Sequence, residues 1–405
     1  MISVTPPADT NLGGSVLQLE SDNDFVRFVE AKLSQGMARS KLFHKTWLYS
    51  VAQYLGYQWH QVRAGSFTLE LPPNLTGRRR TVMNLILPIV EGLAGKLLSE
   101  PVGWSVAPAS SEQRDIESSR LGNKVLDHFN RDLEMDEAWW RFVLWGIITG
   151  NAYVKVWWNP MKGPMHERPF GMEPGEVLDE DGTPLPDAIR EGDVDLDVLS
   201  PFECFHSLDY DKTNDWSFFI VARVHPIDYL KDRFPDHAER IRQDGTDGPE
   251  FYLRKIATFV SSMKYQGPYG VNLQADSAVL KEVWIRPNRK YPRGQLGFVI
   301  GNEVVKRGPL PYPGSPIEIP IRHWRYTYIP GQGLGQGIPE PLTHPQREHN
   351  IATSSLTEAT RKMARLKYLL PKGSGLANTS LDDTHGEVLE YRPVGGQKPM
   401  QMPLA

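Results

Sequence analysis

The chain has 405 residues, of which 40% are hydrophobic, and its formal net charge is −4. This length predicts two or three domains, and this hydrophobic content excludes a disordered protein. Cys204 is the only cysteine, which excludes an intramolecular disulfide, and no run of 18 uncharged apolar residues is present to span a membrane.

The first 150 residues are predicted to be mostly helical. After a flexible start over 1–20, apolar residues recur with helical spacing in five stretches, and Gly56 and Gly150 stand where two of these helices are expected to end. Asn84 precedes the most apolar stretch, which contains charged residues and therefore predicts a buried helix rather than a membrane segment. The expected helices are 22–33, 38–55, 85–98, 110–133 and 136–149.

From residue 152 onward, several stretches alternate apolar and polar residues as β-strands do. The polar insertion 159–192 lies between the first two and predicts a long hairpin tip. Three helices are expected among the later strands: after Pro226, over 236–243 and over 250–266. The expected strands are 152–158, 194–199, 216–224, 281–285, 297–301, 303–307, 317–324 and 387–391.

Residues 330–341, PGQGLGQGIPEP, place glycine at every second position. A phosphate-binding loop of this kind requires a following Gly-Lys-Ser/Thr and a helix that starts at once, whereas here two prolines follow. The pattern therefore favours a flexible, close-packed hinge. The hinge glycines are Gly331, Gly333, Gly335 and Gly337.

The segment 346–370 contains the most regular pattern in the chain. Apolar residues recur there at alternating intervals of four and three, which is the heptad spacing of a helix that packs against other helices. Packing against neighbouring subunits and packing beneath another domain of the same chain both fit this seam. The residues proposed for subunit packing are Ala352, Leu356, Ala359 and Met363. Four cations crowd the end of the segment, where they complement the helix dipole: Arg361, Lys362, Arg365 and Lys367.

Charge is distributed unevenly along the chain. Residues 159–215 contain 15 acidic and 4 basic side chains, a local charge of −11, and residues 281–325 contain 3 acidic and 9 basic ones, a local charge of +6. The acidic region would repel nucleic acid, and the basic region would attract it or an acidic protein. Ordinary solvated surface is the alternative for both regions.

Clustered aspartates offer the only route to an enzyme. Asp193, Asp195 and Asp197 share one face of an expected strand, but a solvated strand face explains them better than a cation site does. The nearby DYDKTND, residues 209–215, lacks the glycine and glutamate that an EF-hand requires at loop positions 6 and 12. The sequence therefore predicts a protein that is not an enzyme and holds no cofactor or metal.

The order of these pieces resembles the portal proteins of tailed bacteriophages, particularly of short-tailed phages. No single motif is specific, and the resemblance over about 45–370 depends on their succession. The residues that carry it are GYQW at 56–59, Asn84, VGWSVAP within 101–108, Gly150 to Tyr153, Ser200 to Glu203 followed by Asp209 and Asp211, and the glycine loop followed by Gln346, Arg347, Asn350, Ser354, Ser355 and Glu358.

The resemblance implies an α+β fold with a mainly helical wing that holds a small sheet, a helical stem and a small α/β clip. It also implies a ring of usually twelve subunits at one capsid vertex of the virion, assembled in the host cytoplasm, through which double-stranded DNA is packed and ejected. Expected boundaries are 21–250 for the wing with its β insertion 152–224, 251–275 and 346–370 for the stem helices, 276–328 for the clip, 329–345 for the hinge, and 371–405 for a tunnel-loop region that returns to the wing.

Partners follow from the same resemblance: the terminase large subunit, head-tail adaptor and tail proteins, and a capsid or scaffolding protein. The clip is expected to dock the terminase, and the four cations of 361–367 are expected near DNA. The clip cations proposed for docking are Arg286, Arg289, Lys290, Arg293, Lys306 and Arg307.

Portal proteins usually continue past the tunnel-loop region, so a chain of 405 residues is expected to be a truncated form. Two other functions remain open. One is another head-tail adaptor ring protein. The other is a metal-dependent nuclease that would use Asp193, Asp195, Asp209 and Asp211.

Overall fold

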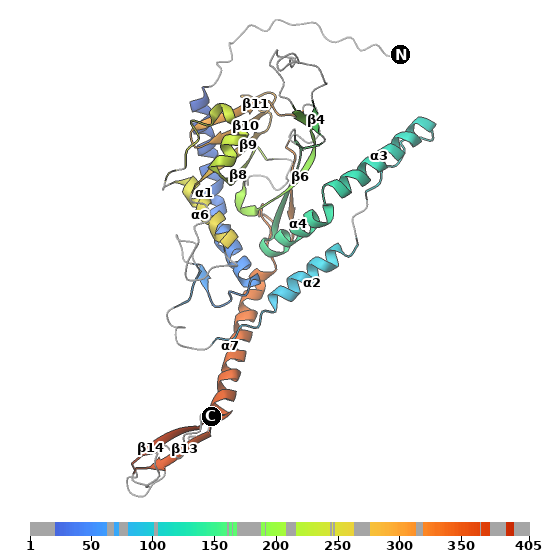
Figure 1. The fold of residues 1–405 in the computed structure, drawn as a ribbon. Helices are drawn as coiled ribbons and strands as arrows, with labels where there is room; N and C mark the ends of the chain where they lie inside the picture. Colours follow the sequence, from blue (N-terminus) through green and yellow to red (C-terminus); the bar gives the residue numbers. More distant parts are fainter. Residues whose placement is uncertain are drawn as a thin grey trace, which may run out of the picture.

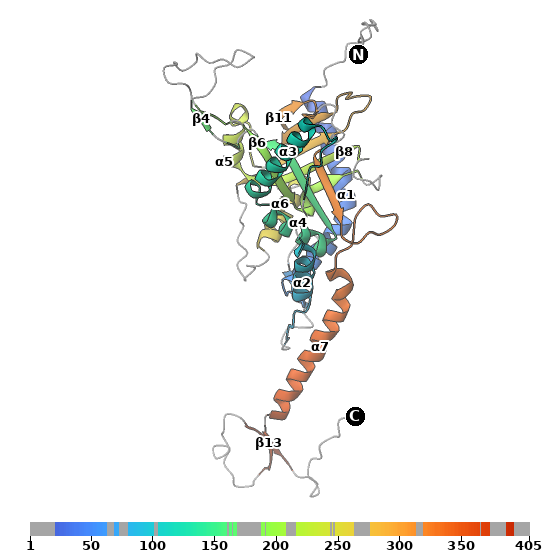
Figure 2. The same cartoon turned by 90° about the vertical axis from the view of Figure 1, so that its right-hand side faces the viewer.

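The structure is a computed structural model in which a body of helices and sheets lies above a long helix, α7, that projects downward from it (Figure 1). The same arrangement is visible after a turn of 90° (Figure 2). The residues that the structure describes are 21–62, 69–72, 80–100, 104–159, 162–163, 165–167, 188–190, 192–207, 216–243, 245, 248–262, 276–312, 319–364, 366–372 and 386–392.

Helix α1 (Asp22–Tyr54) runs the length of the body. Its 33 residues form one continuous helix, so the expected break near Gly36 is wrong. The reason is packing: a Cβ at Gly36 would lie 3.1 Å from Cβ of Phe205, and the missing side chain lets the helix lie close against the sheet. Ser21 caps the start by accepting from the amide of Asp24, and Gly56, at φ +90°, follows the end as expected.

The larger sheet has five antiparallel strands in the order β11-β10-β9-β8-β7. The first half of α1 covers one face of it, where Phe25, Val29 and Leu33 pack against Phe218 and Val283. The strands are β7 (Cys204–His206), β8 (Phe218–Pro226), β9 (Ser277–Ile285), β10 (Gln295–Ile300) and β11 (Glu303–Gly308).

This sheet corrects the expected boundary of the clip. Strand β9 pairs with β8 along its whole length, so residues 276–312 belong to the same body as 204–226 and do not form a separate module. Helix α6 (Pro249–Ser262), expected as part of a stem, packs its Leu253 against α1 and this sheet. Alternating sequence patterns show which residues face a core but not which strands pair, and that is why the boundary was misplaced.

A second sheet has three strands in the order β12-β3-β6. The expected hairpin is confirmed, because β3 pairs antiparallel with β6. Most of the insertion 159–192 lies outside the described residues, and its described part includes a short strand pair, β4 and β5. The β content therefore exceeds the small sheet expected of the wing. The strands are β3 (Asn151–Asn159), β4 (Met165–Glu167), β5 (Ala188–Arg190), β6 (Asp193–Leu199) and β12 (Ile321–Arg325).

Helices occupy the end of the body nearest α7. Helix α2 (Ile86–Leu98) and helix α4 (Met135–Thr149) pack with the second half of α1 around Trp47, Leu48 and Ile147. Helix α3 (Gln113–Asp132) extends away from the body, and only Ser119 of it is buried (Figure 1). The helix expected over 236–243 is reduced to a 3-10 turn, Pro235–His237. The remaining short elements are β1 (Gln61–Val62), β2 (Leu69–Glu70), the 3-10 turn Pro201–Glu203 and α5 (Ile227–Arg233).

Helix α7 (Pro339–Ala364) starts seven residues earlier and ends six residues earlier than the second stem helix expected over 346–370. Pro339 is its first residue, a position that tolerates proline because the first N–H groups have no partner within the helix. Beyond it, β13 (Leu366–Pro371) pairs in parallel with β14 (Gly386–Tyr391), and this small pair lies at the end of α7 that is farthest from the body (Figures 1 and 2).

Buried histidines in the core make stability depend on acid pH. Burial lowers the pKa of His44 to about 3 and the pKa of His206 to about 4. Below about pH 6.5 these histidines become protonated in the unfolded chain but stay neutral in the folded protein. The free energy of unfolding should therefore fall as pH drops from 6.5 toward 4. Each ring contributes a slope of at most about 1.4 kcal/mol per pH unit.

Replacing His44 with Phe should remove its share of this slope. His44 lies among Trp47, Phe202 and Tyr252, which a phenyl ring also fits. Urea denaturation at several pH values between 4 and 7 measures the slope for both proteins. An unchanged slope in His44→Phe would show that His44 is not held neutral by burial.

Candidate functional site: the root and the exposed seam of helix α7

The glycine loop before α7 is packed tightly against the end of α4. A Cβ at Gly337 would lie 2.7 Å from the carbonyl carbon of Ile148 and closer still to its oxygen, and one at Gly150 would lie 2.5 Å from the carbonyl carbon of Gln336. The amide of Ile338 donates to the carbonyl of Ile147 at 2.8 Å. Gly337 thus makes the close backbone contact expected of a close-packed loop, at a joint between this loop and α4, whereas Gly331, at φ +77°, is exposed. The flexibility expected of the hinge stays a prediction.

Asn151 connects this joint to the smaller sheet. Its Oδ1 accepts from the amide of Gly335 at 2.8 Å and lies 2.9 Å from Nε2 of His323, while its Nδ2 donates to the carbonyl of Gly335 at 3.2 Å. Because Oδ1 is only an acceptor, Nε2 of His323 carries the proton. Asn151 is fully buried, so these bonds are made in a site from which water is excluded.

A second anchor begins about two turns into α7. Gln346, Asn350 and Ser354 recur every four residues and so share one face of the helix, which they turn toward the extended backbone of 81–85. Oε1 of Gln346 accepts from the amide of Leu85 at 3.1 Å, and its Nε2 donates to the carbonyl of Met83 at 2.7 Å. Three further bonds complete this latch: Met83 N to Asn350 Oδ1, Thr81 N to Ser354 Oγ, and Ser354 Oγ to Thr81 O.

The latch continues into the body through two more amides. Nδ2 of Asn350 donates to Oε1 of Gln58, whose Nε2 donates to Oδ1 of Asn84 at 2.8 Å. Asn84 in turn donates to the carbonyl of Tyr54 near the end of α1. Asn350 is only 1% exposed. The long helix is therefore held at its root by a chain of buried amides, which specifies its position more strictly than apolar packing would.

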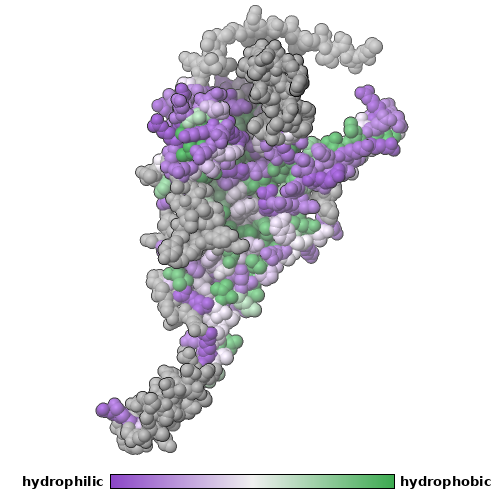
Figure 3. Space-filling view, in the orientation of Figure 1, coloured by the Kyte–Doolittle hydropathy of each residue, from purple (hydrophilic) through white to green (hydrophobic). Residues whose placement is uncertain are grey.

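The opposite face of α7 carries the predicted seam, and nothing in the described residues covers it. Leu356 is 69% and Met363 75% exposed, and Ala352 and Ala359 are exposed as well. At 100° per residue the seam is centred about 150° around the helix axis from the latch. Packing beneath another domain of the same chain is thus excluded for the described residues, and Figure 3 shows hydrophobic side chains at the surface in this lower part of the molecule.

Helix α2, next to the root of α7, also exposes apolar side chains. Ile86, Val90 and Ala94 are buried, but Ile89 and Leu97 are exposed. The expectation of a buried helix is therefore only half right within one subunit. Two apolar helix surfaces, one on α7 and one on α2, are left without a partner in the described part of the chain.

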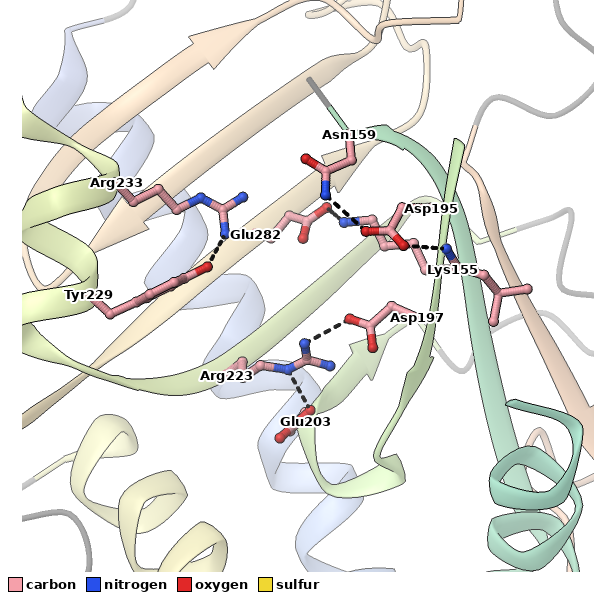
Figure 4. A network of polar contacts seen from close by, with 10 residues as sticks. Lys155, Asn159, Asp195, Asp197, Glu203, Arg223, Tyr229, Arg233 and Glu282 are labelled. Carbon is pink, nitrogen blue, oxygen red and sulfur yellow. Dashed lines mark hydrogen bonds and ion pairs between the residues drawn. The ribbon is translucent and has the colours of Figure 1, made fainter. Parts of the chain in front are cut away.

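Two of the clustered aspartates, Asp195 of the nuclease alternative and its neighbour Asp197, are engaged in other contacts. Arg223 lies between Asp197 and Glu203, at 2.7 and 3.1 Å (Figure 4). Oδ2 of Asp195 accepts from Nδ2 of Asn159 at 2.9 Å. Lys155 of β3 pairs with Glu282 of β9 at 2.5 Å, which joins the two sheets, so these polar groups serve the architecture. Asp209 and Asp211 lie outside the described residues, and among those that are described no three potential metal ligands cluster.

The cations expected near DNA do not share one helix. Arg361 is exposed near the end of α7, where Lys362 also lies, but Lys367 belongs to β13 and Arg365 lies outside the described residues. The cations expected in a clip lie instead on the body: Arg286, Arg289, Lys290 and Arg293 between β9 and β10, and Lys306 and Arg307 on β11.

Residues at the root of α7 were recognised in the sequence only through a family resemblance. Asn84, Asn151, Gln346, Asn350 and Ser354 all meet there, although no function was assigned to them. A spacing of four between Gln346, Asn350 and Ser354 was the available signal, because three short polar residues on one helix face indicate a polar contact.

A mixed α and β body with a projecting helix that is anchored on one face and apolar on the other defines a subunit made to assemble with others. Comparison with known families identifies the family of this subunit. Residues 49–380 match the Phage P22-like portal protein family, and the chain belongs to this family. It is thus a bacteriophage portal protein, a head-tail connector of the capsid vertex with a part in DNA packaging. A search of curated proteins finds no match. In the described residues no helix is long and apolar enough to cross a membrane.

Proposed function

We propose that the chain forms one subunit of a ring, usually of twelve copies, through which double-stranded DNA passes during packaging and ejection. In this proposal α7 is the stem helix, and the copies of α7 from all subunits together surround the channel. The cations of 361–367 then lie near passing DNA. A duplex slides most easily past a protein with few cations, because each neutralised phosphate adds affinity, and the net charge of −4 agrees with this need.

The observation that carries the proposal is the exposed seam of α7. A helix held by its own chain on one face and apolar on the other gains stability when a second copy covers the apolar face. Ala352 and Ala359 have small side chains that let a neighbouring helix approach closely. A ring needs two different surfaces on each subunit, and the exposed apolar side chains of α2, Ile89 and Leu97, are a candidate for part of the second.

Docking of the terminase and of head-tail adaptor or tail proteins is proposed at the far end of α7, where β13 and β14 pair. This differs from the expected site on 276–328, because β9 of that segment pairs with β8 along its whole length. The end of a projecting stem is reachable from outside a ring of bodies, and this supports its role as the clip. Contacts with a capsid or scaffolding protein then fall to the body.

Replacing Leu356 with Glu should prevent ring formation. A carboxylate in the centre of the seam would be buried without a partner when two copies meet, at a cost of several kcal/mol per interface. Native mass spectrometry and negative-stain imaging of the purified protein measure assembly. We expect rings with a central hole for the wild type and monomers for the variant.

Arg361→Glu provides the control, since Arg361 is exposed on the same helix but lies about 170° from the centre of the seam. Rings should persist in this variant. A wild-type protein that stays monomeric at high concentration would contradict the proposed function, and rings that survive Leu356→Glu would show that the seam is not the subunit contact.

A further inference from the structure

A basic surface lies at the end of the body that is remote from α7. It consists of the turn 286–294 between β9 and β10 together with Arg307 of β11, and it borders the first turns of α1 (Figure 1). We call it the basic turn surface. Since α1 spans about 50 Å and its other end lies beside α7, this surface is several tens of ångströms from the root of the stem.

The turn holds its cations in a fixed geometry. Oδ1 of Asn288 accepts from the amides of Lys290 and Tyr291, both at 2.9 Å, and the amide of Asn288 donates to the carbonyl of Tyr291. The amide of Gly294 donates to the same carbonyl at 3.0 Å. Because the turn is closed by these bonds, its side chains start from a rigid backbone and lose less freedom when they bind a ligand.

Aromatic rings beneath the surface position two of the cations. Nζ of Lys290 lies 5.6 Å from the ring centre of Phe28, and the guanidinium of Arg307 lies 4.6 Å from that of Phe25. Gly297 admits the ring of Phe25, because a Cβ there would lie 2.6 Å from its edge. Cations above aromatic faces keep their charge at the surface while their stems are packed.

The surface is cationic and has no apolar anchor. Residues 286–302 contain four basic and no acidic side chains, and Arg289, Lys290 and Arg293 are exposed. Among the described residues, Asp22 of α1 pairs with Arg307 at 3.7 Å, and Asp24 of α1 is held by Ser21. None of the exposed large hydrophobic side chains of the described residues lies in this turn, on β10 or on β11, and Figure 3 shows mainly hydrophilic side chains at this end.

We propose that the basic turn surface binds the phosphate backbone of duplex DNA. A protein partner would be expected to use a buried aromatic or aliphatic anchor, which this surface lacks. Phosphate contacts need only cations and position the duplex without regard to base sequence. The choice of duplex DNA as the polyanion rests on the proposed function, in which the subunits of a ring repeat the turn as a belt of cations outside the α7 channel.

The test compares two charge reversals of equal size. The triple substitution R289E/K290E/R293E changes the basic turn surface, and R114E/R120E/K124E changes three exposed cations of α3 as the matched control. Fluorescence anisotropy with a labelled 30-base-pair duplex measures affinity at several salt concentrations. We expect the turn variant to bind at least tenfold more weakly and its plot of log affinity against log salt to be less steep by about 3, since each lost phosphate contact removes about 0.9.

Equal losses of DNA affinity in both variants would overturn the proposal, because the effect would then follow total charge alone. A wild type that does not bind DNA at 50 mM salt would also overturn it. Binding of poly-glutamate that depends on the turn, with DNA binding unchanged, would assign the surface to an acidic protein instead. The single variant R289Q covers the case in which the triple variant does not fold. Native mass spectrometry of each variant reports ring formation separately, so a failure of the proposed ring is distinguishable from a failure of DNA binding.

Discussion

Substitution of Gly337 by Ala should destabilise the protein by about 3 kcal/mol, within the range for side chains forced into filled space. The new Cβ would meet the carbonyl group of Ile148, which is backbone at the end of α4 and has little freedom to move. To make room, the loop would have to retreat and lose the bond between the amide of Ile338 and the carbonyl of Ile147. Urea denaturation monitored by tryptophan fluorescence measures the loss in the free energy of unfolding.

Gly95→Ala is the matched control, since the same methyl group is added in the exposed interior of α2, where nothing lies within 4 Å. This change should stabilise the helix by about 0.5–1 kcal/mol because alanine is the better helix former. Opposite signs for one chemical change would establish that Gly337 is required for close packing. Equal effects, or a Gly337→Ala variant as stable as the wild type, would instead support the flexible hinge.

Local signals in the sequence were sufficient for most elements of the fold. Gly56 and Gly150 end their helices in the left-handed conformation that their positions suggested, and the alternation over 152–158 and 194–199 corresponds to strands that do pair with each other. Such signals depend on neighbours within a few residues, and for that reason they can be recognised in one sequence.

Contacts between distant segments explain the failures. Gly36 would weaken an isolated helix, but the close approach of α1 to Phe205 outweighs this cost. The pairing of β8 with β9 joins segments separated by α5 and α6, and no residue within either strand identifies the other as its partner. The expectation of a separate module over 276–328 is wrong for this reason, whereas the family resemblance is confirmed.

The seam and the latch illustrate the same distinction within one helix. The seam was recognisable because heptad spacing is local, and its exposure agrees with the interpretation that a neighbouring subunit covers it. The latch was not assigned, because Gln346 and Asn350 bind a backbone segment more than 260 residues earlier in the chain. A polar residue on a helix face indicates that a partner exists but does not indicate which one.

Substitution of Asn350 by Leu should destabilise the protein by about 3 kcal/mol and loosen the root of α7. Leucine occupies a similar volume, so the packing is largely kept, but the amide of Met83, Oε1 of Gln58 and one donor of Gln346 lose their partner. Buried groups left without a hydrogen bond cost about 1–3 kcal/mol each, and local rearrangement recovers part of this. Hydrogen exchange of the Met83 amide, together with urea denaturation, measures both effects.

Thr357→Ala serves as the control one turn beyond the latch, because among the described residues the Thr357 hydroxyl bonds only the carbonyl of Thr353 in its own helix. Its loss should change stability by less than about 0.5 kcal/mol and leave the Met83 amide protected. If Asn350→Leu unfolds the protein no more easily than Thr357→Ala does, the buried amides are not what holds α7. If Met83 alone becomes labile, the latch opens independently of the body, and α7 can change its angle at the root while the glycine joint stays closed.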